Sequence, residues 1–332
     1  MTRRKAILLV LGLSLFIYLI SQTGWHQILD QITRLKWNLI PIVLVYLGVY
    51  ILDTLGWKFS FRQQDHSVSF FHLFWIRLAG EAVNNTTPMG YVGGEPVKAY
   101  MLKSFDVSMP ESFASLVVAK TTLTLSEILF IVFGLTAVFI ELELSLTFKI
   151  VMSLMLVLLT VLVILFMFFQ QKGMFTFIAK ILTRLKIGQD AISKKMEKIK
   201  ELESHLAEFY KSSKWQFIFS FSFHFLGWLA GILEIYLIIV FLGLPLNMLD
   251  ALMIETLHQL IRGLAFWVPG NIGTQEGGNF FIFTLFGLGG AVGLSVSLIR
   301  RIRELIWAAL GWGILVFYKE RHQDFDLEII NK

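Results

Sequence analysis

Long runs of apolar residues, separated by short polar connections, cover most of this chain. Three runs contain few charged side chains and occupy residues 37–61, 148–169 and 215–242. A bilayer core of about 30 Å needs roughly 20 apolar residues per α-helix, so each run predicts a membrane-spanning helix. Residues 112–140 and 291–318 are also long enough, although both contain charged positions. The pattern predicts an all-α, polytopic helical membrane protein.

Residues 6–20 form a further apolar run, which follows a basic start at Arg3, Arg4 and Lys5. A cleaved signal peptide is the competing interpretation. The sequence S-Q-T-G-W that follows lacks the small-x-small pattern of a cleavage site, so we expect an uncleaved first helix.

The composition is that of a membrane protein, and the sequence lacks the common metal-binding and catalytic motifs. The chain has 332 residues, of which 56% are hydrophobic and 16% charged, which is too apolar for a soluble domain of this length. There is no cysteine, no H-E-x-x-H and no G-x-S-x-G, so we expect no metal, no cofactor and no catalytic residue. The glycine runs lack the G-K-[ST] of a phosphate-binding loop.

The distribution of basic residues predicts the topology, because Lys and Arg are enriched in cytoplasmic loops. Residues 171–214 contain ten Lys and Arg against five acids, and we place them in the cytoplasm with both termini. Residues 141–145 and 243–247 contain no base and are expected outside. The apolar spacing within 171–214 predicts short amphipathic helices, either a solvated connecting pair or a membrane-surface element.

This topology forces two segments to enter the membrane and return on the same side. Residues 70–104 start and finish inside, and residues 250–290 start and finish outside. Each contains a loop in which a glutamate follows a proline by seven residues, P-M-G-Y-V-G-G-E at 88–95 and P-G-N-I-G-T-Q-E at 269–276. We predict re-entrant broken helices that turn at Pro88, Gly90, Gly94, Pro269, Gly270 and Gly273.

The two halves align without gaps at an offset of 181 positions. Asp53 then falls on Glu234, Arg77 on His258, Glu81 on Arg262, Glu95 on Glu276, and Lys120 on Arg301. Because residues 37–61 run inward and 215–242 outward, the halves are predicted to be inverted repeats, an arrangement that places a site near the bilayer centre. The alternative is that membrane helices place charges at similar depths without a repeat.

We therefore expect a single integral membrane domain over residues 1–332. Its parts are an N-terminal helix and amphipathic segment (1–36), the first repeat (37–171), basic cytosolic connecting helices (172–214), the second repeat (215–318) and a cytosolic tail (319–332).

Ionisable groups inside spans are costly and usually functional. Polar and basic residues beside the two loops are candidates for binding an anionic headgroup, since a restarting helix and a guanidinium both favour phosphate. These substrate-binding candidates are Arg77, Asn85, Lys98, Lys120, Arg262 and Arg301. Candidates for gating or proton coupling are Glu81, Glu95, Glu276 and Glu304. The alternative is that each base pairs with a local acid, such as Arg301 with Glu304 or Arg77 with Glu81.

Three motifs carry a family resemblance: N-N-T-T-P-M-G-Y-V-G-G-E-P-V-K-A-Y, V-P-G-N-I-G-T-Q-E-G and R-R-I-R-E-L-I-W-A-A-L-G. Together they resemble the flippase-like membrane family, also called the lysylphosphatidylglycerol synthase transmembrane region. The resemblance implies a multi-pass protein of the bacterial or archaeal plasma (inner) membrane that moves lipids or lipid-linked sugars. The family's motif residues correspond to Asn85, Pro88, Gly94, Glu95, Lys98, Pro269, Gly273, Glu276, Arg301 and Glu304.

Lysylphosphatidylglycerol synthases carry a cytosolic aminoacyl-transferase domain after this region. Only 14 residues follow Tyr318 here, so we expect this chain not to aminoacylate a lipid by itself.

The expected function is flippase- or scramblase-like transport rather than catalysis. The substrate would be an anionic phospholipid or a polyprenyl-phosphate-linked glycolipid that passes through a midplane cationic cavity. Expected partners are membrane lipids and no nucleic acid, with a homo-oligomer or a separate lipid or glycan synthase left open. The alternatives are a lipid-modifying enzyme and an accessory scaffold that docks a synthase through Lys194 to Lys200.

Overall fold

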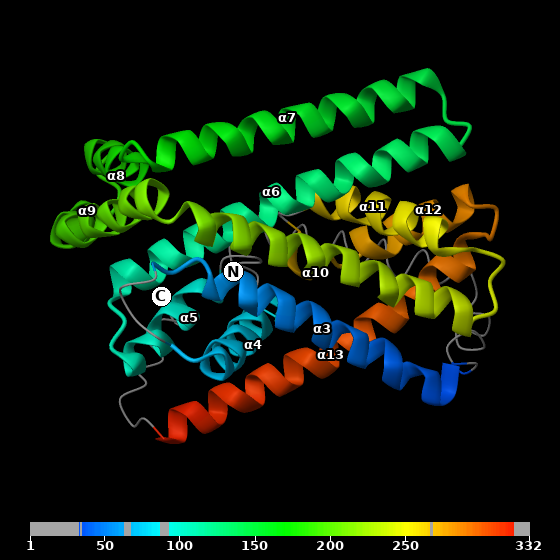
Figure 1. Cartoon of the computed structure of the whole chain (residues 1–332), viewed down its shortest axis with the longest axis horizontal. Coiled ribbons are helices and arrows are strands. Elements are labelled where there is room, and N and C mark those ends of the chain that lie inside the picture. The colour runs from blue at the N-terminus through cyan, green and yellow to red at the C-terminus, as the bar shows by residue number, and fades with distance from the viewer. Residues whose placement is uncertain (1–32, 34, 63–67, 87–92, 266–267, 322–332) are drawn as a thin grey trace.

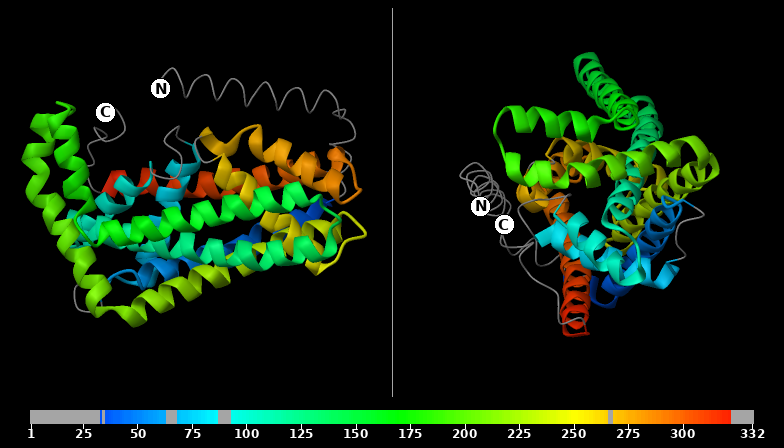
Figure 2. Two further views of the ribbon diagram at one scale, coloured as in Figure 1. Left: turned by 90° about the horizontal axis from the view of Figure 1, so that it is seen from above. Right: turned by 90° about the vertical axis from the view of Figure 1, so that its left-hand side faces the viewer.

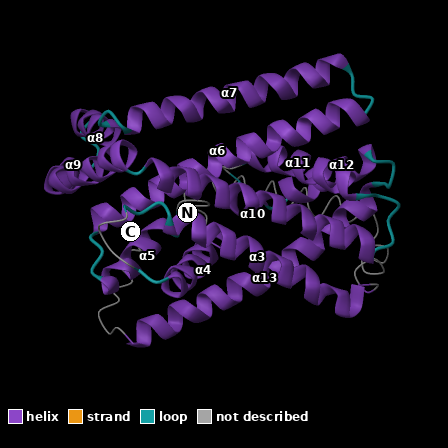
Figure 3. Cartoon of the chain, viewed as in Figure 1, coloured by secondary structure: helices purple, strands orange, loops and turns teal. Residues whose placement is uncertain are grey.

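The computed structural model describes residue 33 and residues 35–62, 68–86, 93–265 and 268–321. All regular structure in these residues is helical, which confirms the all-α prediction (Figure 3). The predicted first helix at 6–20, Pro88 and Gly90 lie outside the described residues.

Within the described residues, four helices are long and apolar enough to cross a membrane, and they coincide with predicted spans. They are α3 (Leu39–Lys58, preceded by a short 3-10 turn), α6 (Met109–Glu141), α7 (Leu146–Gln170) and α10 (Lys214–Phe241). The last predicted span is α13 (Gly290–Arg321), which is nearly as long as α6 but has arginines at its middle. The shorter helices are α4 (Phe70–Thr86), α5 (Glu95–Leu102), α8 (Met174–Arg184), α9 (Gln189–Ser212), α11 (Met248–Leu264) and α12 (Thr274–Leu285).

Helix starts follow the local sequence. Ser108 accepts a hydrogen bond from the Glu111 backbone N–H at the start of α6, where Pro110 occupies the first turn. At α11, the Asn247 side chain accepts from the Asp250 backbone, and the Asp250 carboxylate accepts from the Asn247 backbone. These caps satisfy N–H groups that a helix terminus leaves without partners, so polar residues concentrate at the ends of apolar helices.

The long helices run roughly alongside one another, and their ends agree with the predicted relative sidedness. In Figure 1, α8, α9 and the end of α13 lie at the left. The α6–α7 and α10–α11 connections lie at the right. The two basic regions therefore share one end and the two base-free connections share the other. Which end faces the cytoplasm is a prediction from charge.

Helices α3 and α10 pack closely because glycine removes side-chain bulk from their contact. A Cβ added at Gly56 would lie 2.6 Å from the His224 ring, and one at Gly227 would lie 2.9 Å from the Asp53 carboxylate. Small residues let membrane helices approach closely where water cannot drive association. The same contact brings a carboxylate and an imidazole together inside the bundle.

Two helices of the second half begin at or close to positions that match helices of the first half. Helix α6 begins at residue 109 and α13 at 290, which is 181 positions later. Helix α5 begins at Glu95, and Glu276 lies in the first turn of α12. In Figure 1, α3 and α10 run in opposite directions, as do α6 and α13. A repeated unit would produce these coincidences, whereas inversion across a bilayer and re-entrance of the loops remain predictions.

The segment predicted to hold connecting helices forms α8 and α9. Figure 2 shows both lying across the ends of the long helices. Helix α8 leaves Phe177, Ile178 and Ile181 exposed, while Leu206 and Phe209 of α9 are buried against α6. The uncovered apolar side of α8 favours the membrane-surface alternative for this helix.

Helix α13 provides a direct test of the close packing. A Cβ at Gly311 would lie 2.3 Å from the Leu78 carbonyl oxygen of α4, whereas one at Gly313 would meet no atom within 4 Å. We expect Gly311→Ala to lower the free energy of unfolding by about 1–3 kcal/mol, because the added methyl overpacks the α4–α13 contact. The matched variant Gly313→Ala should be neutral or slightly stabilising, since alanine is the better helix former.

Thermal unfolding of both variants in the same detergent measures the difference. Equal unfolding midpoints for Gly311→Ala and Gly313→Ala would contradict the contact between α4 and α13.

Candidate functional site

The first of two buried ionic clusters joins α3, α4 and α10. The Arg77 Nη2 atom lies 2.6 Å from the Asp53 Oδ2 atom, and the His224 Nδ1 atom lies 3.1 Å from Asp53 Oδ1. Asp53 thus contacts an arginine on one neighbouring helix and an imidazole on another. Because an unpaired charge in a low-dielectric interior is strongly disfavoured, this triad fixes the relative position of three helices.

The same cluster extends to the start of α5. The Lys98 Nζ atom lies 2.7 Å from Glu81 Oε1 and 3.1 Å from Glu95 Oε1, and Lys120 Nζ of α6 lies 3.1 Å from Glu95 Oε1. Lys98 is buried, whereas the Lys120 side chain is 37% exposed. Lys120 therefore has the most exposed side chain among the three bases of this cluster.

The helix restart after the first loop is held by an amide. Asn84 at the end of α4 accepts a hydrogen bond from the Gly94 backbone N–H at 2.7 Å, and its Nδ2 donates to Glu95 at 3.3 Å. A Cβ at Gly94 would lie 1.9 Å from the Gly80 carbonyl oxygen, so only glycine permits this approach. The Asn84 side chain thus ties the end of α4 to the first turn of α5.

The second cluster lies on α13 and its neighbours. Glu234 of α10 pairs with Arg300 at 3.3 Å and with Arg303 at 2.9 Å, and Arg300 also reaches Glu255 of α11 at 2.9 Å. The Arg303 guanidinium also stacks 3.6 Å above the Tyr46 ring centroid of α3. Glu234 is fully buried, so its charge depends on these two arginines.

Arg301 holds the second loop in place. Its guanidinium donates to Glu276 at 2.9 Å and to Glu304 at 3.0 Å, and also to the backbone carbonyls of Gly270 and Asn271. The loop has left-handed backbone at Gly270 (φ 61°) and positive φ at Gly273 (φ 82°), where glycine avoids the steric penalty. The Arg301 guanidinium therefore donates hydrogen bonds to backbone carbonyls that have no partner within a helix.

Corresponding pairs occupy both halves. Glu95 pairs with Lys120 at 3.1 Å, and Glu276 pairs with Arg301 at 2.9 Å. Both members of the second pair follow the first by 181 positions. Glu276 has a further role, because its other oxygen accepts from the Gly273 backbone N–H at 2.7 Å and caps α12.

Two cavities lie at these clusters. One of about 90 Å³ lies where the end of α4 meets the second loop and α13. Its lining includes Asn84, Asn85, Arg262, Gly270, Asn271, Gln275, Arg301 and Glu304. A smaller one of about 20 Å³ is lined in part by Arg77, Glu95, Lys98, Lys120 and His224. Asn84 connects the two clusters, since it lines the first cavity and donates to Glu95 beside the second.

Several buried polar atoms at these cavities have no hydrogen-bond partner among the described residues. Gln275 Nε2 is one at the larger cavity, and Arg77 Nε, Glu95 Oε2 and His224 Nε2 are others at the smaller one. Unpartnered buried polar atoms are disfavoured and require a bound water, ion or ligand group. The arrangement can therefore hold a polar group with both donor and acceptor atoms.

The predicted substrate-binding residues all lie in this region, but they are divided between the two cavities. Arg77, Lys98 and Lys120 line the smaller cavity, and Asn85, Arg262 and Arg301 line the larger. The suggested Arg77–Glu81 pair is wrong, because Arg77 pairs with Asp53 and Glu81 with Lys98. The Arg301–Glu304 pair is confirmed.

The expectation of a cationic cavity needs correction. Acids balance the bases: Asp53, Glu81 and Glu95 face Arg77, Lys98 and Lys120 in the first cluster. In the second, Glu234, Glu255, Glu276 and Glu304 face Arg300, Arg301 and Arg303. An anionic group would have to displace a carboxylate rather than enter a bare positive site.

Sequence reasoning missed His224, Glu255, Asn271 and Gln275 as members of the site. Gln275 stands directly before the motif glutamate and Asn271 within the glycine loop, so both could have been found from the loop sequence. His224 and Glu255 carry no such local signal. Their role depends on which helices pack against α3 and α13.

The described residues form an all-helical, polytopic membrane protein with ion pairs inside the bundle, and comparison gives its family. The chain belongs to the family described as the lysylphosphatidylglycerol synthase TM region, whose family model matches residues 6–313. It is similar to a UPF0104 membrane protein of Methanothermobacter thermautotrophicus, 25% identical over 95% of each chain.

Two other UPF0104 membrane proteins are similar over almost their full length. The one from Pyrococcus horikoshii is 24% identical over 94% of this chain and 96% of its own. The one from Methanocaldococcus jannaschii is 22% identical over 91% of each. No solved structure shows a significant match.

The burial of Glu234 generates a stability prediction. Glu234→Gln removes the carboxylate that Arg300 and Arg303 share inside the bundle. We expect the free energy of unfolding to fall by about 3–5 kcal/mol, because the buried arginines then lack one of the carboxylates that balance their charge. The measurements are the yield of monodisperse protein in detergent and its thermal unfolding midpoint.

The control is Glu197→Gln, which removes the same charge from an exposed position on α9. If both variants unfolded at the wild-type temperature, Glu234 would not be a structural counter-ion.

Proposed function

We propose that this protein moves an anionic lipid between the leaflets of the plasma membrane, as a flippase or scramblase, without converting it chemically. The observation that carries the proposal is the cavity at the junction of the two halves. It lies between the two ionic clusters and is lined by Arg301, Arg262 and Gln275, whose Nε2 atom has no hydrogen-bond partner among the described residues. Guanidinium and amide donors match the oxygens of a phosphate-linked headgroup.

The headgroup is proposed to exchange partners with the carboxylates already present. As a phosphate approaches Arg301, it replaces Glu276 or Glu304 as the acceptor, and the released carboxylate takes a proton or another base. Lys120 can exchange in the same way, because Glu95 retains Lys98 when Lys120 moves to the ligand. Pair exchange keeps every buried charge compensated during passage, which keeps the barrier low.

Corresponding pairs in the two halves suggest how access alternates. Glu95–Lys120 and Glu276–Arg301 each connect a broken loop to the long helix behind it. In the proposed cycle, one pair opens towards one leaflet while the other remains closed, and the two inverted halves rock about the α3–α10 contact. The acyl or polyprenyl chains remain in the bilayer.

The family description supports a lipid substrate, because it names a lipid synthase whose membrane region matches this chain. The substrate class proposed is an anionic phospholipid or a polyprenyl-phosphate-linked glycolipid. Basic residues in 172–214 and at the end of α13 support a cytoplasmic location for both termini in this proposal.

Transport of a fluorescent phosphatidylglycerol in proteoliposomes tests the proposal. Lys120→Ala should reduce the rate by about 10-fold or more, since a charge-assisted hydrogen bond to the headgroup contributes about 1.5–3 kcal/mol. The fold should persist because Glu95 keeps Lys98 as a partner. Mass spectrometry of the extracted lipid should find it unchanged.

The matched control is Lys180→Ala, which removes an exposed lysine of α8 away from both cavities. Wild-type transport rates in Lys120→Ala, or an equal loss in Lys180→Ala, would argue against a headgroup site at these clusters. Chemical conversion of the lipid by purified protein would favour an enzyme instead.

A further inference from the structure

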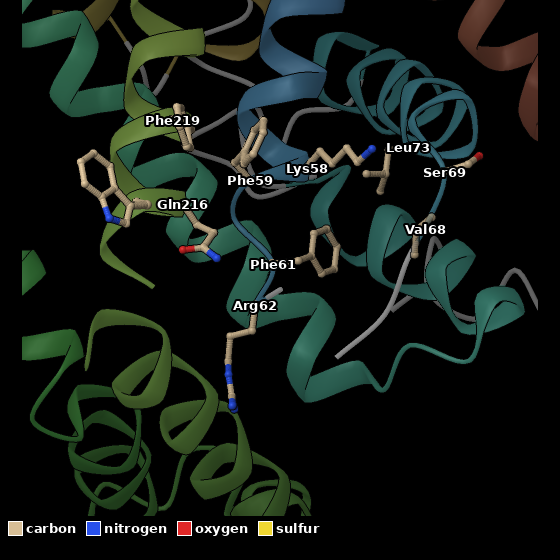
Figure 4. Close-up of a pocket in the computed structure, with 10 residues that line it drawn as sticks. Lys58, Phe59, Phe61, Arg62, Val68, Ser69, Leu73, Gln216 and Phe219 are labelled. Atoms are coloured by element: carbon tan, nitrogen blue, oxygen red, sulfur yellow. The ribbon is translucent and has the colours of Figure 1, made fainter. Parts of the chain in front are cut away.

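A third pocket lies away from both ionic clusters, at the end of the molecule that also holds α8 and α9. Its volume is about 480 Å³, larger than either cavity of the candidate site. It is enclosed by the end of α3 and the residues that follow it, the start of α4 and the start of α10 (Figure 4). This volume is in the range that small-molecule sites occupy.

The pocket has a buried apolar floor. Phe61, Val68 and Leu73 are almost fully buried and come from the segments that follow α3 and begin α4. Their burial shows that the floor belongs to the packed interior of the bundle. An apolar ligand chain in contact with them would remove part of its surface from water.

One wall is a row of aromatic rings at the start of α10 and the end of α3. The Phe59 and Phe219 ring centroids lie 5.2 Å apart, and Trp215 continues the row at 6.5 Å from Phe219. Trp215 is 70% exposed and stands directly after Lys214 at the start of α10. Tryptophan beside lysine at a helix end is typical of the membrane–water boundary.

The remaining lining is polar and cationic. Lys58, Arg62, Ser69 and Gln216 contribute to the pocket, and Arg62 is paired with Glu208 of α9. Lys58 is exposed and has no carboxylate within ion-pair distance among the residues described. Figure 4 shows its side chain extended towards Leu73 and Ser69.

We propose that this pocket binds an anionic phospholipid at the membrane surface. The phosphate contacts Lys58 on the side of the pocket that Ser69 lines, and one acyl chain lies along the aromatic row. A zwitterionic lipid has its own ammonium beside the phosphate and gains less from Lys58, so the pocket selects for net negative charge. The site does not depend on translocation, because it stands apart from the loops and their ion pairs.

Binding is measured by native mass spectrometry of the full chain released from nanodiscs that contain phosphatidylcholine and graded phosphatidylglycerol. Lys58→Ala should weaken retention of phosphatidylglycerol about fivefold, which corresponds to about 1 kcal/mol for one lysine near an anionic headgroup. Lys58→Arg should keep wild-type retention. Lys211→Ala, an exposed lysine of α9 outside the pocket, is the matched control and should also keep it.

A second measurement places the lipid in the pocket. Phosphatidylglycerol with brominated chains quenches tryptophan fluorescence at contact distance. The contribution of Trp215 to the quenching is the difference between the wild-type protein and Trp215→Phe. With brominated phosphatidylglycerol, this contribution should be smaller in the Lys58→Ala background. With brominated phosphatidylcholine, it should not depend on Lys58.

Equal weakening in Lys58→Ala and Lys211→Ala would overturn the proposal in favour of diffuse surface attraction. Unchanged retention in Lys58→Ala, or equal retention of phosphatidylcholine, would overturn it as well. Loss of binding in Lys58→Ala with normal transport would separate this pocket from the translocation site.

Discussion

Compensation of buried charge is the constraint on which the structure depends. The broken loops bring carboxylates into the interior of an apolar bundle, where an isolated ion would be unstable. Carboxylates there pair with bases from other helices, as Asp53 does with Arg77 and Glu276 with Arg301. The pairs connect α3, α4, α12 and α13 more specifically than apolar packing can, because lipid-facing and core-facing side chains are equally hydrophobic.

The same compensation suits the proposed transport site. A neutral set of pairs is stable when empty, yet each pair offers a base that a phosphate can take by exchange. Lys120 and Arg301 are the bases best suited, since their carboxylates have other hydrogen bonds when the base moves. A bare cationic cavity would bind an anion more tightly and release it more slowly.

The sequence predicted the helical class and the positions of the long spans well. A 20-residue apolar run has few alternatives in a bilayer, so α3, α7 and α10 follow from residues 37–61, 148–169 and 215–242. It also identified the loops around Gly94 and Gly273, because glycine and glutamate together oppose a lipid-facing helix. The partners in the ion pairs were harder to predict from the sequence. Glu81 lies one turn from Arg77 on the same helix, but Arg77 contacts Asp53 instead.

The sequence by itself therefore determined which residues carry charge into the membrane and at what position along each helix. Only the tertiary structure decided their partners, since Asp53 and His224 are 171 positions apart and meet only because glycines let α3 and α10 touch. The surface pocket has the same origin. Its floor, aromatic wall and lysine come from three chain segments, and no local pattern reports that the ends of α3 and α10 meet the start of α4.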